Sequence, residues 1–209
     1  MGGPVKINRR LQSGDRRDQI IQAALKLIGE KGVGSLTTSA LARAADISEA
    51  NLYRHFKSKN EILFETGKAI GSAIRKNLET VLGTAERPIA KLRRAFLLHL
   101  EFFEQNEGIP RLGLSEEMHV QSQKLKDEFL QNIKVYSLAF ETIIKEGQQD
   151  DVIRQDLDAR STAAMLVGLV QFTVTKWSLT GFSFSLASEG LKLWRNFERC
   201  IRPEAMLIK

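Results

Sequence analysis

The sequence predicts an all-α protein, and three observations support this fold class. Apolar residues recur at helical spacing over most of the 209 residues. No segment alternates between apolar and polar residues for long enough to indicate a half-buried strand. The four prolines stand where helices are expected to begin or end. We therefore expect about nine helices, with a compact N-terminal group of three short helices followed by a larger C-terminal helical bundle.

The first helix is expected to begin near Asp15. Its apolar residues recur at i, i+4, i+7 and i+8 spacing, which places one buried stripe on the helix: Ile20, Ala24, Leu27 and Ile28. Gly32 is placed to end this helix, because glycine accepts the left-handed conformation that follows many helices.

Residues 37–56 predict two short helices joined by a tight turn. Thr37 is expected to cap the first helix and Ser48 the second. Leu52 and Phe56 lie four residues apart and would hold the second helix against the first. The opposite face of that second helix is then polar, and it carries Glu49, Ala50, Asn51, Arg54 and His55, with Tyr53 to one side. A short projecting helix with polar groups near its N-terminus fits the major groove of DNA.

Contacts to the DNA backbone are expected at the helix starts around this motif. Ser58-Lys59-Asn60-Glu61 matches a capping box, so another helix begins there with unbonded N–H groups beside the Lys59 ammonium. Such groups favour a phosphate. The same reasoning applies to the hydroxyl residues at the earlier helix starts, Thr37, Thr38 and Ser48. The side chains of Tyr53 and His55 add further hydrogen-bond donors for the DNA backbone.

The charge of the chain is concentrated at the same end. Residues 1–60 hold 11 Lys and Arg against 5 Asp and Glu, whereas the remaining residues hold 20 of each. The whole excess of +6 therefore lies in the first sixty residues, as expected for a region that meets a polyanion. A basic tail that only aids solubility explains the first arginines but not Arg54 and Lys59. We expect four arginines to follow the DNA backbone or enter a minor groove: Arg9, Arg10, Arg16 and Arg17.

Longer helices are expected after residue 58. They cover residues 58–82, 87–106, a shorter stretch near 108–120, 122–147, 159–179 and 186–201. Apolar residues on the middle helices are candidates for a ligand pocket, although core residues would look the same: Phe96, Leu100, Phe103, Met118 and Phe140. Apolar faces of the last two helices are the best candidates for a dimer seam: Val167, Val170, Val174, Leu193, Phe197 and Ile201.

Residues 15–63 resemble the DNA-binding domain of the TetR family of bacterial transcriptional regulators. The resemblance is carried by Gly32, Thr37-Thr38, Leu41-Ala42, Ile47-Ser48 and the run from Leu52 to Lys59. Two residues depart from the family pattern. Asp46 stands in the turn where glycine is usual, and Ala50 stands where glycine is common. The wording SEANLYRHF also resembles the nucleoid-occlusion branch of the family.

This resemblance implies a homodimer with a ligand cavity in the helical bundle. It also implies that an effector shifts the fourth helix as a lever and so changes the separation of the two reading helices. The expected domains are a basic arm over residues 1–14, a helix-turn-helix domain over 15–60, and a ligand-binding and dimerisation domain over 61–209.

Several other classes of protein are disfavoured by the sequence. No apolar run approaches the ~18 residues of a membrane span, and the basic N-terminus has no apolar segment behind it, so export is not expected. Cys200 stands alone, which excludes an internal disulfide and fits a reducing cytoplasm. No catalytic trio or phosphate-binding glycine loop is present, so we expect no enzyme and no cofactor. Carboxylate and imidazole groups suit several metals, and four residues could supply them: His99, Glu116, Glu117 and His119. For these residues ordinary packing is favoured over a metal site.

The expected function is that of a cytoplasmic, nucleoid-associated transcriptional regulator. We expect a homodimeric repressor that binds two half-sites in double-stranded DNA and is released by a small apolar effector. Two alternatives stay open: a nucleoid-occlusion or architectural DNA-binding factor without an inducer, and an enzyme or ligand carrier whose basic end is incidental. The last predicts that DNA affinity does not respond to Tyr53→Ala combined with Lys59→Ala.

Overall fold

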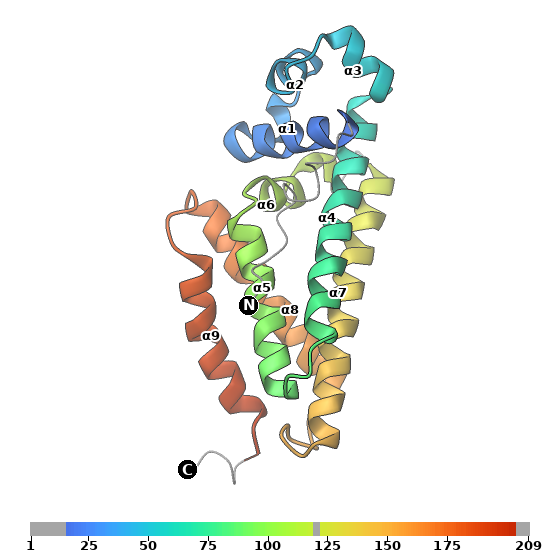
Figure 1. The fold of residues 1–209 in the computed structure, drawn as a ribbon. Helices are drawn as coiled ribbons and strands as arrows, with labels where there is room; N and C mark the ends of the chain where they lie inside the picture. The colour runs from blue at the N-terminus through green and yellow to red at the C-terminus, as the bar shows by residue number, and fades with distance from the viewer. Residues whose placement is uncertain (1–15, 119–121, 204–209) are drawn as a thin grey trace. The chain divides into compact units, whose positions relative to one another are not determined.

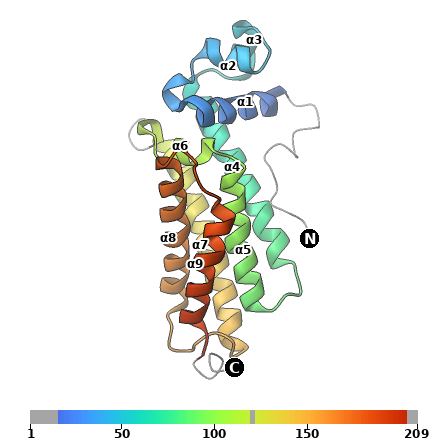
Figure 2. The same cartoon turned by 90° about the vertical axis from the view of Figure 1, so that its left-hand side faces the viewer.

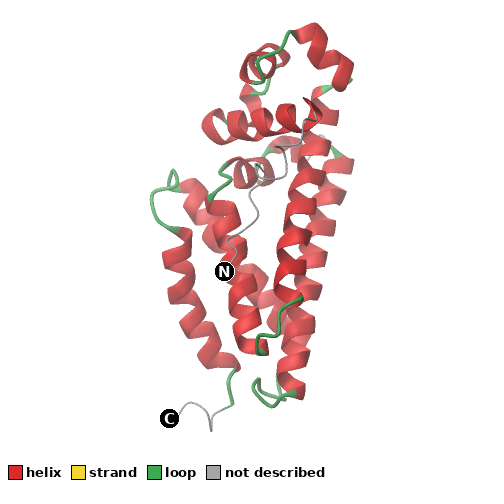
Figure 3. Cartoon of the chain, viewed as in Figure 1, coloured by secondary structure: helices red, strands yellow, loops and turns green. Residues whose placement is uncertain are grey.

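The computed structural model describes residues 16–118 and 122–203. Within these residues helices are joined by loops and there is no strand (Figure 3), so the predicted fold class is confirmed. The described residues form nine α-helices and one short 3-10 turn: α1 (Arg16–Lys31), η2 (Val33–Ser35), α2 (Thr38–Ala44), α3 (Glu49–His55), α4 (Lys59–Leu82), α5 (Pro88–Glu104), α6 (Gly108–Gly113), α7 (Gln123–Gln149), α8 (Ala159–Leu179) and α9 (Leu186–Ile201).

The described chain forms two compact units, and each is considered by itself. The N-terminal unit contains residues 16–73 together with 105–118 and 122–132. The bundle unit contains residues 74–104 and 133–203. The predicted domain boundary at residue 60 and the predicted arm over residues 1–14, which lies outside the described residues, stay predictions.

Helix α1 organises the N-terminal unit, in which it packs against η2, α2, α3 and α6 (Figure 1). It ends as expected at Gly32, whose φ of +79° is left-handed and whose N–H donates to the Ile28 carbonyl at 2.8 Å. The approach of α6 to α1 is close because both contribute a glycine. A Cβ at Gly108 would stand 2.2 Å from the Leu25 carbonyl oxygen, so the backbones meet there without an intervening side chain.

The same unit also joins the first part of α4 to the first part of α7. Gly67 and Gly71 on α4 face Leu125 and Asn132 on α7, and a Cβ at Gly71 would stand 2.2 Å from the Asn132 Oδ1 atom. Both polar atoms of the Asn132 amide are buried without a hydrogen-bond partner. Neither glycine can be enlarged without displacing the side chain that covers it.

The bundle unit is built around α5, which packs against both α8 and α9. Figure 2 shows α8 and α9 running side by side, and the contacts between them agree. The later part of α7 belongs to this unit and contacts α5. Lys91 pairs with Glu146 at 3.1 Å, and the buried Tyr136 hydroxyl donates to the Ala95 carbonyl at 2.6 Å. Among residues 16–118 and 122–203, no helix has the length and hydropathy needed to cross a membrane.

Candidate nucleic-acid interface

Two side-chain caps define the starts of α2 and α3, as the sequence predicted. The Ala40 N–H donates to Thr37 Oγ1 at 3.1 Å, and the Asn51 N–H donates to Ser48 Oγ at 3.1 Å. Each cap satisfies one N–H group that the helix itself cannot pair. Between the helices Asp46 adopts a φ of +52°, so an aspartate occupies the left-handed position where the family pattern has glycine.

The position of α3 is determined by two buried side chains. Leu52 and Phe56 are each 1% exposed, and Leu41 of α2 is equally buried. Ile47, in the turn between the two helices, is half-buried. Because one side of α3 is committed to this core, the polar side is left outward.

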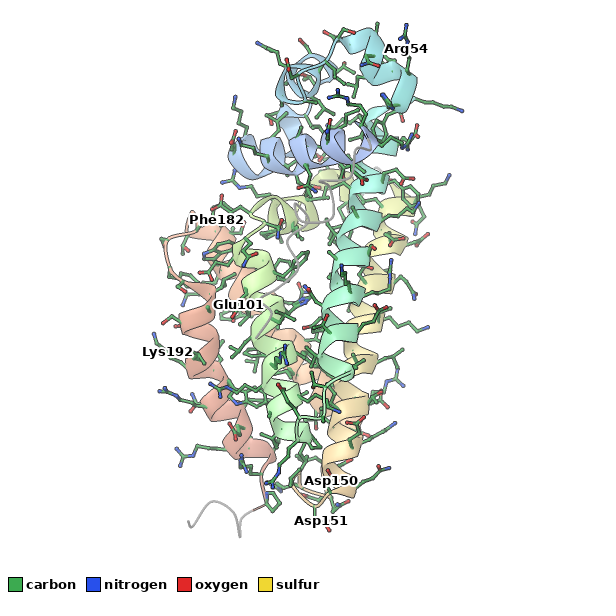
Figure 4. The ribbon with its side chains drawn as sticks, in the orientation of Figure 1. Arg54, Glu101, Asp150, Asp151, Phe182 and Lys192 are labelled. Carbon is green, nitrogen blue, oxygen red and sulfur yellow. The ribbon has the colours of Figure 1, made fainter. Side chains whose placement is uncertain are left out.

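The outward side of α3 carries most of the residues predicted to meet DNA. Glu49, Ala50 and Arg54 are exposed, and Tyr53 is 55% exposed although it is aromatic. Arg54 lies on the side of α3 that faces away from α1 (Figure 4). Three neighbouring residues are half-buried: Thr38, Asn51 and His55. Thr37 and Ser48 are exposed at the helix starts. These nine residues therefore lie within one unit, on α2, α3 and their caps, whereas Lys59 is the first residue of α4.

The corner between α3 and α4 differs in detail from the predicted capping box. The Glu61 N–H donates to Ser58 Oγ at 3.2 Å as expected. The Glu61 carboxylate, however, accepts from the Lys57 N–H at 2.7 Å, one residue before the position that a capping box uses. That hydrogen bond, together with the nearby Arg17 guanidinium, lowers the pKa of the Glu61 carboxyl below its usual value. The carboxylate is thus kept ionised at the corner.

Lys59 is held by groups that sequence reasoning did not identify. Its ammonium lies 3.1 Å from the Glu117 carboxylate and donates to the Val33 carbonyl at 3.3 Å. Burial opposes ionisation of Glu117, but hydrogen bonds from its own backbone and from Lys59 lower the pKa of its carboxyl overall. The ammonium that was predicted to meet a phosphate therefore already has an anionic partner within the chain.

Arg17 was also missed as part of this corner. It was predicted to follow the DNA backbone, yet its guanidinium contacts the His55 carbonyl, the Phe56 ring and the Glu61 carboxylate. These partners lie 38 or more residues away in sequence, so no local pattern indicated them.

The residues proposed for a ligand pocket are divided between the two units. Phe96 and Leu100 of α5 and Phe140 of α7 are fully buried in the bundle unit, where Phe103 is 8% exposed. Met118 is half-buried and belongs to the N-terminal unit. Their role as a pocket stays a prediction.

His99 lies among these aromatic residues. Its ring centroid is 3.8 Å from that of Tyr136 and 4.8 Å from that of Phe103. Full burial lowers the pKa of His99 to about 3, so the imidazole is neutral at physiological pH. Among the described residues no group of three or more His, Cys, Asp or Glu side chains is arranged to hold a metal, and His119 lies outside them.

The residues proposed for a dimer seam are mostly core residues of the bundle unit. Four of them are at most 5% exposed within the described chain: Val170, Val174, Phe197 and Ile201. Val167 and Leu193 are half-buried. The open apolar residues of α8 are instead Met165, Phe172 and Leu179, which are 63, 70 and 77% exposed and stand seven residues apart. Gly168, between them, has open space where a Cβ would stand.

Comparison with known proteins agrees with this architecture. The family model described as bacterial regulatory proteins, tetR family, matches residues 20–66, and the model of the YsiA-like protein, C-terminal region, matches residues 67–195. The nucleoid occlusion factor SlmA of Aliivibrio fischeri is 25% identical over 181 residues, covering 86% of this chain and 92% of that protein. SlmA of Marinomonas sp. is 26% identical over 157 residues, covering 75% and 80%.

Solved structures share the fold at low sequence identity. The fatty acid degradation regulator FadR from Bacillus halodurans superposes with a TM-score of 0.77 at 20% identity, covering 90% of this chain and 96% of its own. FadR from Bacillus subtilis, solved in complex with stearoyl-CoA, gives 0.72 at 24% identity, covering 86% and 96%. A regulator from Saccharomonospora viridis in complex with choline gives 0.79 at 22% identity, covering 90% and 98%. This chain belongs to the TetR family of bacterial regulatory proteins and is a DNA-binding transcription regulator with a helix-turn-helix.

Proposed function

We propose that this regulator is a homodimeric repressor that holds its operator through α3 and is released by an apolar effector. The observation that carries the proposal is the two-sided character of α3. Leu52 and Phe56 anchor one side in the core, while Tyr53 and Arg54 stand outward beside the capped helix start at Ser48. A helix mounted in this way can enter a major groove with its N-terminal residues at the base edges.

The proposed division of labour within the interface follows from residue chemistry. Asn51 and Arg54 have planar groups that can bond two atoms of one base edge, so we assign them to sequence reading. The exposed phenol of Tyr53 and the helix starts at Thr37 and Ser48 are assigned to phosphate contacts, which fix register without reading sequence. The chain would act by binding at the nucleoid, in the cytoplasm, without catalysis.

We place the dimer seam on the open apolar face of α8. Met165, Phe172 and Leu179 recur every two turns, which makes a continuous stripe along one helix. Large apolar side chains exposed in such a stripe usually mark an interface. Sequence-specific DNA binding also favours a dimer, because a single helix-turn-helix makes few base contacts. Two copies can bind two half-sites whose centres are ~34–36 Å apart.

The proposed effector is apolar because the interior of the bundle unit is aromatic. Phe103 of α5 and Tyr136 of α7 contact the neutral His99, Tyr136 also contacts Phe140, and the buried Phe96 contacts Trp194 of α9. The FadR regulator of Bacillus subtilis was solved with stearoyl-CoA, so a long-chain acyl-CoA is the first effector to test. For release, the effector must bind the DNA-free state more tightly than the DNA-bound state.

A nucleoid-occlusion role is the second candidate. It is favoured by the SlmA relatives, one of which is matched over 92% of its length. Selection of bound fragments from the host genome separates the two functions. A repressor is expected to recover one or a few sites next to regulated genes, whereas an occlusion factor recovers many sites scattered over the chromosome.

A further test addresses the incidental-charge alternative. Tyr53→Ala combined with Lys59→Ala should weaken binding to all duplex sequences if these residues meet phosphates. If the double variant binds DNA as tightly as the wild type, the proposed interface is wrong.

A further inference from the structure

Arg17 joins three elements of the N-terminal unit through one guanidinium. It donates to the carbonyl of His55, the last residue of α3. Its guanidinium carbon lies 4.2 Å from the centroid of the Phe56 ring, and one of its nitrogens lies 3.3 Å from the Glu61 carboxylate. Arg17 itself is on α1, so α1, the end of α3 and the start of α4 meet at a single side chain.

These contacts stabilise the corner in different ways. The last carbonyls of a helix have no partner within the helix, and a cation placed there is favourable. Phe56 is 1% exposed, so the stacked guanidinium covers the edge of the core that anchors α3. Glu61 also links Arg17 to the backbone before α4, because its other carboxylate oxygen accepts a hydrogen bond from the Lys57 N–H at 2.7 Å.

We propose that Arg17 is a positioning residue for DNA binding, which sets the angle of α3 and the corner beyond it without touching DNA. The inference rests on the proposed interface, because it concerns how that interface is held. It differs from the sequence prediction, which gave Arg16 and Arg17 the same role along the DNA backbone. Arg16 is exposed, whereas Arg17 is half-buried against its three partners.

Salt dependence of DNA affinity distinguishes positioning from contact. Losing a phosphate contact lowers the slope of log K against log salt by about one unit. Arg17→Ala is expected to weaken binding by about tenfold with an unchanged slope. A slope that falls by about one, or an affinity equal to that of the wild type, would overturn the proposal. Arg16→Ala, at the exposed neighbouring position that is predicted to follow the DNA backbone, removes the same charge and is the comparison variant, whose slope should fall by about one.

Arg17→Lys keeps the positive charge and provides a second test of the proposal if Arg17→Ala does not fold. Lysine cannot reproduce the planar stack and the fork of donors. We therefore expect weaker binding than the wild type, again with an unchanged slope, in samples shown by circular dichroism to be folded. Wild-type affinity in Arg17→Lys would show that charge alone suffices and would overturn the proposal. Failure of the wild-type protein to bind any duplex would instead overturn the proposed function.

The ion pair between Lys59 and Glu117 independently supports a second inference. Lys59 is the first residue of α4, where a helix start and an ammonium together favour a phosphate. Glu117 follows α6 in sequence, and its side chain is only 14% exposed, while that of Lys59 is 39% exposed. The carboxylate therefore approaches the ammonium from the protein side and takes the place of an external anion.

We infer that Glu117 competes with DNA for Lys59. In this arrangement the segment after α6 lowers DNA affinity whenever the ion pair is formed, and a shift of that segment would release Lys59 for a phosphate. The inference again rests on the proposed interface. It gives the chain a route by which a change near α6 alters DNA affinity through one side chain.

Two neighbouring glutamates allow a matched test. Glu117→Gln is expected to bind duplex DNA roughly two- to fivefold more tightly than the wild type, as expected for loss of a partly exposed ion pair. Glu116→Gln, at the exposed adjacent position, removes the same charge without the contact and should have a smaller effect. In a Lys59→Ala background Glu117→Gln should have no larger effect than Glu116→Gln. Equal effects of the two glutamine variants in the wild-type background, or an undiminished effect of Glu117→Gln without Lys59, would overturn the inference.

Discussion

Replacement of Phe172 by Asp is expected to separate the proposed dimer without unfolding the chain. Phe172 is 70% exposed on α8, so its side chain contributes little to the core of its own bundle unit. Complete burial of such a side chain is worth about 1.5–3 kcal/mol. If the seam covers the exposed part in both copies, the loss is roughly 2–4 kcal/mol, which corresponds to a roughly 30- to 700-fold rise in the dimer Kd.

Sedimentation equilibrium over a range of protein concentrations measures this change. Leu138→Asp is the matched control, because Leu138 is 50% exposed on α7 and lies outside the proposed seam. DNA affinity should fall with dimerisation in the Phe172 variant, since one copy reaches only one half-site. If Phe172→Asp dimerises as tightly as the wild type, the seam is not on this face of α8.

Three further predictions concern folding. Ser48→Ala removes the acceptor of the Asn51 N–H and should lower the free energy of unfolding by about 1 kcal/mol in urea denaturation; an unchanged midpoint would contradict the role of the cap. Gly71→Ala should cost ~1–3 kcal/mol in the same assay, because its Cβ would stand 2.2 Å from Asn132 Oδ1, and adding Asn132→Ala should restore most of the loss; no recovery would point to another cause. Burial lowers the pKa of His99 from 6.5 to about 3. Between pH 6.5 and pH 3 the unfolded chain therefore binds one proton more than the folded chain. The free energy of unfolding is retained above pH 6.5 and falls by about 1.4 kcal/mol for each pH unit below it. His99→Leu should remove that part of the pH dependence between pH 7 and 5, and an identical dependence in both proteins would refute the assignment.

Local features of the helix-turn-helix could be predicted because their causes lie within four residues. Thr37 and Ser48 each accept a hydrogen bond from the N–H three residues later, and Gly32 ends α1 with a left-handed φ. Asp46 stands where the family pattern has glycine, and its φ of +52° is left-handed as that pattern implies. Such features depend on residues that are close together in the sequence, so the sequence alone indicates them.

Contacts between distant segments could not be predicted in this way. Lys59 and Glu117 are 58 residues apart, and Arg17 meets Glu61 across 44 residues. A basic residue near a DNA-binding motif has the same appearance in sequence whether it meets a phosphate or a carboxylate. Only the packing of α1 and of the segment after α6 decides between these partners.

The faces of α8 show a different limit. This helix is apolar on more than one side, so hydropathy alone does not say which residues enter the core. The prediction chose Val170 and Val174, which are buried within the chain, and passed over Phe172, which is 70% exposed. The choice depends on where α5 and α9 lie against α8, which the sequence of α8 does not contain.

The role of α3 in reading sequence is decided by a ratio of two affinities. The measurement compares binding to a fragment selected from the genome with binding to the same duplex scrambled, at one salt concentration, for the wild type and for Asn51→Ala combined with Arg54→Ala. The wild type should prefer the selected site by roughly 10³-fold or more, and the variant should lose at least about tenfold of that preference while keeping its affinity for scrambled DNA within a few-fold. A variant that retains the full preference would show that another surface reads the sequence.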